Sequence, residues 1–179
     1  MNPGVSYRPH YTVTDYLQWE GDWELWKGVA VAMTPSPFGR HGMMLMRLGT
    51  ALTNAVDRGE CDASVLAEID WIVSPDTVIR PDISVVCGPP PEGHIESSPA
   101  LVVEVLSEST RERDLLHKRE LYQENAVPWY IIGDPVEQEI TILQLSDSGK
   151  YEAVETSEEC EITLCDHCKT TIDLRWSRR

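Results

Sequence analysis

The sequence predicts an α/β, or α+β, fold in which helices flank a mixed β-sheet. Three observations predict it. Short apolar segments have the length and alternation of strands, two longer segments have helical spacing, and the two kinds of element are interspersed along the chain. With 179 residues the chain has the length of one domain. We expect a core at about residues 11–145 and a C-terminal extension of strand and tail at 146–179.

The N-terminal part is expected to hold a short helix, a hairpin and a long helix. The short helix is predicted at residues 11–19. Between Trp23 and Met33 apolar positions alternate around a Lys-Gly pair, which is typical of a β-hairpin, and we expect this hairpin to open the sheet. Pro35-Ser36-Pro37 then interrupts the strand, and residues 38–57 have the apolar spacing of an amphipathic helix.

The rest of the chain is predicted to form strands around one more helix. Ser109 and Glu112 have the spacing of a capping box, so a helix is expected from Ser109 until shortly before Pro128. The predicted strands are residues 64–72, 77–86, 101–106, 129–132, 138–145 and 150–154.

No membrane span or secretion signal is expected. The longest apolar run, residues 101–106 if Glu104 is overlooked, is far shorter than the roughly 20 residues that cross a bilayer. Residues 1–11 lack an apolar stretch preceded by basic residues. We therefore expect a cytoplasmic protein with no membrane partner.

The five cysteines are odd in number and unevenly placed, which favours free thiols over a disulfide framework. Cys165 and Cys168 have the CxxC spacing of half a zinc site, and Cys160 and His167 lie close to them. Zinc at these residues is the less favoured alternative.

The net charge of −15 opposes long-range attraction to nucleic acid. The charge is unevenly spread, because residues 152–161 carry five glutamates whereas residues 111–119 contain several basic side chains. Clusters of acidic metal ligands also lower the net charge, and a bound cation would reverse it locally.

Two carboxylates stand in otherwise apolar strands. Glu104 lies within residues 101–106, and Asp82 lies in the segment 80–86. Burying a lone charge there would be costly, and a divalent cation bound by hard oxygen ligands would compensate both. The alternatives are a solvated sheet face or an ion pair with an arginine such as Arg80 or Arg111.

The helix that follows Glu104 places further polar groups on one face. Asp114, Lys118 and Tyr122 recur every four residues. A lysine near a metal-bound water can orient that water or stabilise charge on a transferred phosphoryl group. The alternative is a solvated lysine. His41 lies on the inward stripe of its own helix, where it could contact a substrate phosphate, tune a carboxylate or serve as a buried structural histidine.

Taken together, these motifs resemble the small bacterial endonucleases of the Uma type, a family within the PD-(D/E)XK superfamily. The resemblance covers about residues 11–145. It rests on residues 11–17, Trp23-Glu24-Leu25, Pro35-Ser36-Pro37 with His41, Arg80-Pro81-Asp82, residues 102–107, Asp114 with Lys118 and Tyr122, and Asp134-Pro135.

The resemblance implies a restriction-endonuclease-like core and a metal-dependent DNA endonuclease using Mg²⁺ or Mn²⁺. Asp82 and Glu104 would be the principal metal ligands, with Glu24 contributing. Lys118 would replace the motif lysine, which normally stands two residues after the glutamate, where this chain has Leu106. Two positions depart from the family pattern, Val29 and Gly42.

We therefore expect catalytic roles for Glu24, Asp82, Glu104 and Lys118, and substrate contacts by His41 and Tyr122. DNA is the expected partner. A homodimer is expected because two strands require two active centres. The alternatives are a catalytically idle DNA- or protein-binding module on the same fold, and a zinc-stabilised interaction domain.

Overall fold

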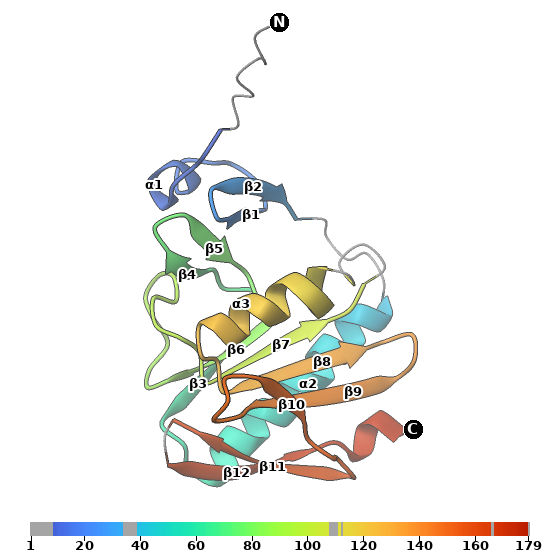
Figure 1. Ribbon diagram of the computed structural model, residues 1–179. Coiled ribbons are helices and arrows are strands. Elements are labelled where there is room, and N and C mark those ends of the chain that lie inside the picture. Colours follow the sequence, from blue (N-terminus) through green and yellow to red (C-terminus); the bar gives the residue numbers. More distant parts are fainter. Residues whose placement is uncertain (1–8, 34–38, 108–110, 112, 166, 179) are drawn as a thin grey trace, which may run out of the picture.

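In the computed structural model, the described residues are 9–33, 39–107, 111, 113–165 and 167–178. They form a mixed six-stranded sheet with a helix on each face (Figure 1). A four-stranded sheet lies at one end of the molecule and a two-stranded hairpin at the other. The predicted α+β architecture with a mixed sheet flanked by helices is confirmed.

The central sheet has the strand order β10-β9-β8-β7-β6-β3. Its strands are β3 (Ala63–Ala67), β6 (Ile83–Cys87), β7 (Leu101–Val105), β8 (Trp129–Asp134), β9 (Glu139–Leu145) and β10 (Tyr151–Ala153). Only the pair β7–β8 is parallel. A parallel pair requires a crossover connection, and here the crossover carries the helix that supplies Lys118 and Tyr122.

The two faces of the sheet bury separate clusters. On β7, Leu101, Val103 and Val105 pack in the cluster that contains helix α2 (Gly39–Gly59), because alternate residues of a strand face the same side. Val102 packs on the other face, beneath helix α3 (Arg119–Glu124). The same alternation points Glu104 toward α3.

The remaining helices are short. They are α1 (Val13–Tyr16), the π-helix η1 (Arg113–Lys118), which runs directly into α3, and the 3₁₀-helix η2 (Arg175–Arg178). The predicted Pro35-Ser36-Pro37 break and the Ser109–Glu112 capping box lie outside the described residues. No helix of the described part is long and apolar enough to cross a membrane.

The predicted N-terminal hairpin is present but does not join the central sheet. Strands β1 (Trp23–Trp26) and β2 (Val29–Ala32) are connected through Lys27 and Gly28, both at positive φ, as a two-residue hairpin turn requires. β1 pairs next with β5 (Thr77–Ile79), and β5 with β4 (Trp71–Ser74). The prediction that this hairpin opens the main sheet is therefore wrong.

The chain passes between the two sheets at two breaks, and the sequence prediction contains neither of them. The predicted strand 64–72 is two strands, β3 and β4, separated around Glu68, which has a φ of 54°. The predicted strand 77–86 is also two strands, β5 and β6, separated at Arg80-Pro81. Proline has no N–H to donate to a ladder, so the chain leaves one sheet there and enters the other.

The C-terminal residues form an additional hairpin of β11 (Glu159–Leu164) and β12 (Cys168–Asp173). Alternate residues of this hairpin, including Ile162, Leu164 and Ile172, are buried in the cluster around α2. The hairpin therefore completes the hydrophobic core on that side of the molecule.

Two disulfides attach this hairpin to the rest of the fold. Cys61 pairs with Cys168, and Cys87 pairs with Cys165, while Cys160 is a buried free thiol. The prediction of free thiols is wrong for the four paired cysteines. Their sequence separations of 107 and 78 residues explain the error, because only the folded chain brings the partners together. Because Cys165 and Cys168 are in disulfides, their sulfur atoms cannot serve as the thiolate ligands of the zinc alternative.

Candidate active site

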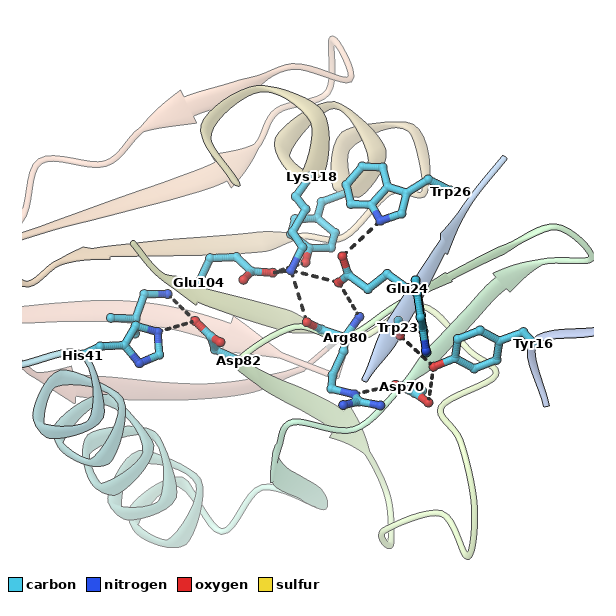
Figure 2. Close-up of polar contacts among 12 residues, drawn as sticks. Tyr16, Trp23, Glu24, Trp26, His41, Asp70, Arg80, Asp82, Glu104 and Lys118 are labelled. Atoms are coloured by element: carbon cyan, nitrogen blue, oxygen red, sulfur yellow. Dashed lines mark hydrogen bonds and ion pairs between the residues drawn. The ribbon is translucent and has the colours of Figure 1, made fainter. Parts of the chain in front are cut away.

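Glu24, Glu104 and Lys118 meet in the interior from three separate elements. Glu24 lies on β1 of the small sheet, Glu104 on β7 of the central sheet, and Lys118 at the end of the π-helix. The Lys118 Nζ atom is 2.8 Å from Oε1 of Glu104 and 3.2 Å from Oε1 of Glu24 (Figure 2). None of the three residues is more than 2% exposed. The structure thus brings these predicted site residues into one buried ionic cluster.

Glu104 is held by donors from the overlying helix. Lys118 Nζ and the hydroxyl of Tyr122 both donate to its Oε1 atom. Burial, and after it the charge of Glu104, raises the pKa of Tyr122 well above its ordinary value, so the hydroxyl keeps its proton and acts as a donor. Tyr122, expected to contact substrate, is fully buried and contacts Glu104 instead of the surface.

Glu24 is held by donors on both carboxylate oxygens. The main-chain N–H of Arg80 donates to Oε1 at 2.9 Å, and the indole N–H of Trp26 donates to Oε2 at 3.0 Å. The carbonyl of Arg80 in turn accepts a hydrogen bond of 3.1 Å from Lys118 Nζ. Hydrogen bonds to a buried carboxylate offset the cost of removing it from water.

Asp82 stands beside this cluster on the neighbouring chain segment. β6 and β7 are paired at Ile83 and Val103, so continuing the register by one residue places Asp82 opposite Glu104. The Oδ2 atom of Asp82 accepts a 2.6 Å hydrogen bond from the N–H of Val105. Its other oxygen, Oδ1, has no hydrogen bond within the described part of the chain.

His41, at the start of α2, contacts Asp82 from the opposite face of the sheet. Its Nε2 atom is 3.5 Å from Oδ2 of Asp82, and the two side chains are 13% and 21% exposed, so this end of the site opens toward the surface. The hydrogen bond with Asp82 raises the pKa of His41, against the lowering effect of burial. This contact places His41 where it can tune the carboxylate.

The donor set suits a hard cation with an incomplete protein shell. In the described ranges, no three His, Cys, Asp or Glu side chains are grouped so that they could hold a metal ion by themselves. Asp82 and Glu104 provide oxygen donors from adjacent strands, and magnesium is commonly bound by one or two carboxylates while water and phosphate fill its other positions. The residues therefore fit magnesium and do not form a closed cage.

A second polar cluster, unforeseen from the sequence, lies behind Glu24. Arg80 Nε donates to Asp70 at 2.7 Å and Arg80 Nη1 donates to Asp22 at 2.9 Å. The Tyr16 hydroxyl lies 2.8 Å from Asp70 and 3.0 Å from the carbonyl oxygen of Trp23. The sequence gives no sign of this cluster beyond the position of Arg80 next to Pro81-Asp82, because its side chains come from separate segments of the chain.

Both strand carboxylates have cationic partners, but among the described residues these partners are not Arg80 or Arg111, the arginines suggested from the sequence. Arg80 pairs with Asp70 and Asp22, and Arg111 pairs with Asp134 at 2.7 Å. Glu104 has Lys118 as its cationic partner and Asp82 has His41. The side chain of Asp114, the first member of the predicted helical face, lies outside the described part.

Comparison with known proteins agrees with this fold. An uncharacterized protein of Synechocystis sp. (strain PCC 6803) is 31% identical over 150 residues, which cover 80% of this chain and 78% of the relative. A crystal structure described as a putative nuclease belonging to DUF820, from Anabaena variabilis, has a TM-score of 0.68 at 18% identity, covering 88% of this chain and 91% of that one. The likeness confirms a restriction-endonuclease-like fold. The model of the Uma2 family, described as "Putative restriction endonuclease", matches residues 13–174, and the chain belongs to this family.

Proposed function

We propose that this protein is an endonuclease that hydrolyses phosphodiester bonds of DNA and depends on Mg²⁺ or Mn²⁺. The observation that carries the proposal is the meeting of Glu104, Lys118 and Glu24, at 2.8 and 3.2 Å, beside Asp82 on the neighbouring segment. Carboxylates with a lysine are suited to phosphoryl transfer, since the carboxylates bind the cation and the lysine acts on the phosphate or the water. Membership of a family described as "Putative restriction endonuclease" supports the same class of reaction.

Asp82 and Glu104 are the proposed principal ligands of the cation, with Glu24 as a further contributor. When bound, the cation would supply Lewis acidity toward the phosphate and lower the pKa of a coordinated water. Oδ1 of Asp82 is the oxygen that could bind the cation without breaking a hydrogen bond, since it is Oδ2 that accepts the N–H of Val105. Glu24 would have to give up hydrogen bonds from Arg80 or Trp26 in order to bind the cation.

Lys118 is the proposed group that acts on the reacting phosphate or the attacking water. Its ammonium is held by Glu104, Glu24 and the carbonyl of Arg80, so it is oriented before substrate arrives. A preorganised charge stabilises a transition state without reorganisation during the reaction. We assign Tyr122 to the support of Glu104, and the contact with substrate phosphate to His41, which lies at the more open end of the site.

The experiment is nicking of supercoiled plasmid at low salt, with Mg²⁺, Mn²⁺ or EDTA. We expect cleavage with either cation, none with EDTA, and a loss of at least about 100-fold in Asp82→Asn, as removal of one essential charged group from a site produces. Asp147→Asn, at an exposed turn far from the site in sequence, is the matched control and should retain full activity. Cleavage that continues in EDTA, or that survives in Asp82→Asn, would contradict the proposal. A folded wild type inactive on every form of DNA would instead support the idle binding module.

A further inference from the structure

Arg80 contacts the candidate site only through its main chain. Its N–H donates to Glu24 at 2.9 Å, and its carbonyl accepts from Lys118 at 3.1 Å. The two peptide groups on either side of Arg80 therefore bind the Glu24 carboxylate and the Lys118 ammonium, respectively. Because Pro81 follows, the chain has little freedom to adjust on that side. The orientation of this short segment determines where the Lys118 ammonium can lie.

The side chain of Arg80 is anchored on the opposite side, away from Lys118. Its guanidinium binds Asp70, which is buried, at 2.7 Å (Figure 2). It also binds Asp22 at 2.9 Å. A planar guanidinium that binds two carboxylates has fewer accessible orientations than a lysine would have. Burial disfavours the charged form, but the hydrogen bonds to Asp70 and Asp22 outweigh it and raise the pKa of Arg80, so the anchor stays charged.

Tyr16 connects this anchor to the strand that carries Glu24. Its hydroxyl lies 2.8 Å from Asp70 and 3.0 Å from the carbonyl of Trp23, the residue before Glu24. The Tyr16 hydroxyl thus connects the two chain segments that hold Glu24. It contacts strand β1 directly, and it reaches Arg80 through Asp70. Among the described residues, none of these side chains forms a hydrogen bond or ion pair with Lys118 or Glu104.

We propose that Arg80 is a positioning residue for Lys118, and that Tyr16, Asp70 and Asp22 hold Arg80 in the orientation that the site requires. The part concerning turnover rests on the proposed nuclease function. Displacement of a reacting group by about 1 Å can cost on the order of 100-fold in rate. The Tyr16–Asp70–Arg80 cluster is then a second set of residues that the reaction needs, although it is remote from the reacting atoms.

Two pairs of matched variants test the proposal. Tyr16→Phe and Tyr151→Phe each remove one hydroxyl, and the hydroxyl of Tyr151 donates at 2.8 Å to the carbonyl of Val127, away from the carboxylates. Arg80→Met and Arg175→Met each remove an arginine paired with aspartate, and Arg175 pairs with Asp173 in the C-terminal region. Arg80→Lys keeps the positive charge, so its Lys118 labelling rate and its turnover should lie between those of wild type and Arg80→Met. Tyr16→Phe keeps the test decisive if Arg80→Met fails to fold.

The first measurement does not depend on activity. Amine-directed labelling followed by mass spectrometry reports the reaction rate of Lys118 relative to that of Lys27, which is an exposed internal standard. We expect the rate at Lys118 to rise about tenfold or more in Tyr16→Phe and Arg80→Met, the factor that corresponds to losing one hydrogen bond to a charged group. The control variants should leave it unchanged at a matched melting temperature. Equal protection of Lys118 in all variants would overturn the proposal.

The second measurement is turnover on plasmid DNA. We expect kcat to fall in Tyr16→Phe and Arg80→Met with little change in KM, whereas Tyr151→Phe and Arg175→Met should match wild type. A rise in KM with kcat unchanged, or an equal loss of kcat in the controls, would contradict a positioning role. If wild type has no nuclease activity, the proposed function fails, while the labelling result still decides whether Arg80 positions Lys118.

Discussion

At the scale of single residues, the main feature is a cluster of charged side chains that are buried together. Glu24, Glu104 and Lys118 are almost completely buried, and both carboxylate oxygens of Glu24 and the Oε1 atom of Glu104 accept hydrogen bonds from specific donors. A buried ion pair is weak evidence of stability, because desolvation can exceed the Coulombic gain, but removing one partner alone is costly. The loss of folding stability on mutation therefore depends on which member of the cluster is replaced.

Glu104→Gln and Lys118→Met should both abolish cleavage yet differ in stability. Glutamine can still accept hydrogen bonds from Lys118 and Tyr122, so we expect a loss of about 1 kcal/mol, the size of an ordinary hydrogen bond. Methionine leaves Glu104 and Glu24 without the ammonium between them, so we expect a loss of about 3–5 kcal/mol. Urea unfolding without divalent cation measures the difference. Equal stability of the two variants would show that Lys118 does not balance the cluster.

The two strand carboxylates could be predicted from the sequence, and the support around them could not. Glu104 is conspicuous because a lone acid interrupts an apolar strand, and the four-residue spacing relates Lys118 to Tyr122. Arg80 has no such signal, since its contacts with Glu24 and Lys118 use backbone atoms that every residue possesses. Tyr16 and Asp70 lie 54 residues apart, and a hydrogen bond over that separation exists only in the folded chain.

At the scale of elements, strands and helices were predictable where one periodicity persists. The β1–β2 hairpin, α2, β7 and β8 follow their apolar patterns. The transfer from β5 to β6 was missed, because both strands are apolar and a change of sheet does not change the pattern. The C-terminal hairpin was missed because its alternation of Cys160, Ile162 and Leu164 with glutamate and threonine stands in an acidic stretch.

The β8–β9 turn provides a pH-dependent prediction. Burial alone would raise the pKa of Asp134, but the N–H groups of Glu137 and Val136 and the guanidinium of Arg111 outweigh it and lower the pKa. A lowered folded-state pKa means that this carboxylate stabilises the fold above its unfolded pKa of about 3.9, and that the contribution is lost as the pH falls through the folded value. Asp134→Asn should therefore cost about 1 kcal/mol at pH 7, within the range for such hydrogen bonds.

The measurement for Asp134 is the difference in unfolding free energy between wild type and Asp134→Asn from pH 7 down to about pH 3, the region of the unfolded carboxylate pKa. The difference should shrink as the pH falls. A difference that stays constant, or grows, in acid would show that the charge of Asp134 is not what stabilises the turn.

The two disulfides should make the stability of the whole domain depend on redox conditions. They close loops spanning 107 and 78 residues, and loops of this length correspond to about 4–5 kcal/mol per disulfide in the chain-entropy account, with measured values commonly about 2–5. We expect a reductant to lower the melting temperature of wild type markedly. A variant with Cys61, Cys87, Cys165 and Cys168 replaced by serine should melt lower than oxidised wild type and be indifferent to reductant. If reductant leaves wild type unchanged, the disulfides are not stabilising.

At the scale of the whole molecule, the proposed function requires that a protein with a net charge of −15 bind a polyanion at this site. Binding of DNA relies on neutralising phosphates, and the carboxylates of the site oppose it as long as they lack a cation. A divalent cation at Asp82 and Glu104 would reverse the local sign. The general acidity of the chain and the proposed metal dependence are thus connected, because the cation would serve substrate binding as well as chemistry.

Binding of duplex DNA should therefore depend on a divalent cation in wild type, and this separates the enzyme from the idle module. With Ca²⁺ in place of Mg²⁺, at constant ionic strength, fluorescence anisotropy of a labelled duplex should show affinity at least about tenfold higher than in EDTA, a change equivalent to about 1.4 kcal/mol. Asp82→Asn should bind more tightly than wild type in EDTA, because one repelling charge is gone, and should gain little from Ca²⁺. Asp147→Asn changes the net charge by the same amount at an exposed turn and should behave as wild type. Ionic strength has to be fixed because counterion release alone changes DNA affinity steeply. An idle DNA-binding module would bind equally with and without the cation, and that outcome would remove the metal from the proposed function.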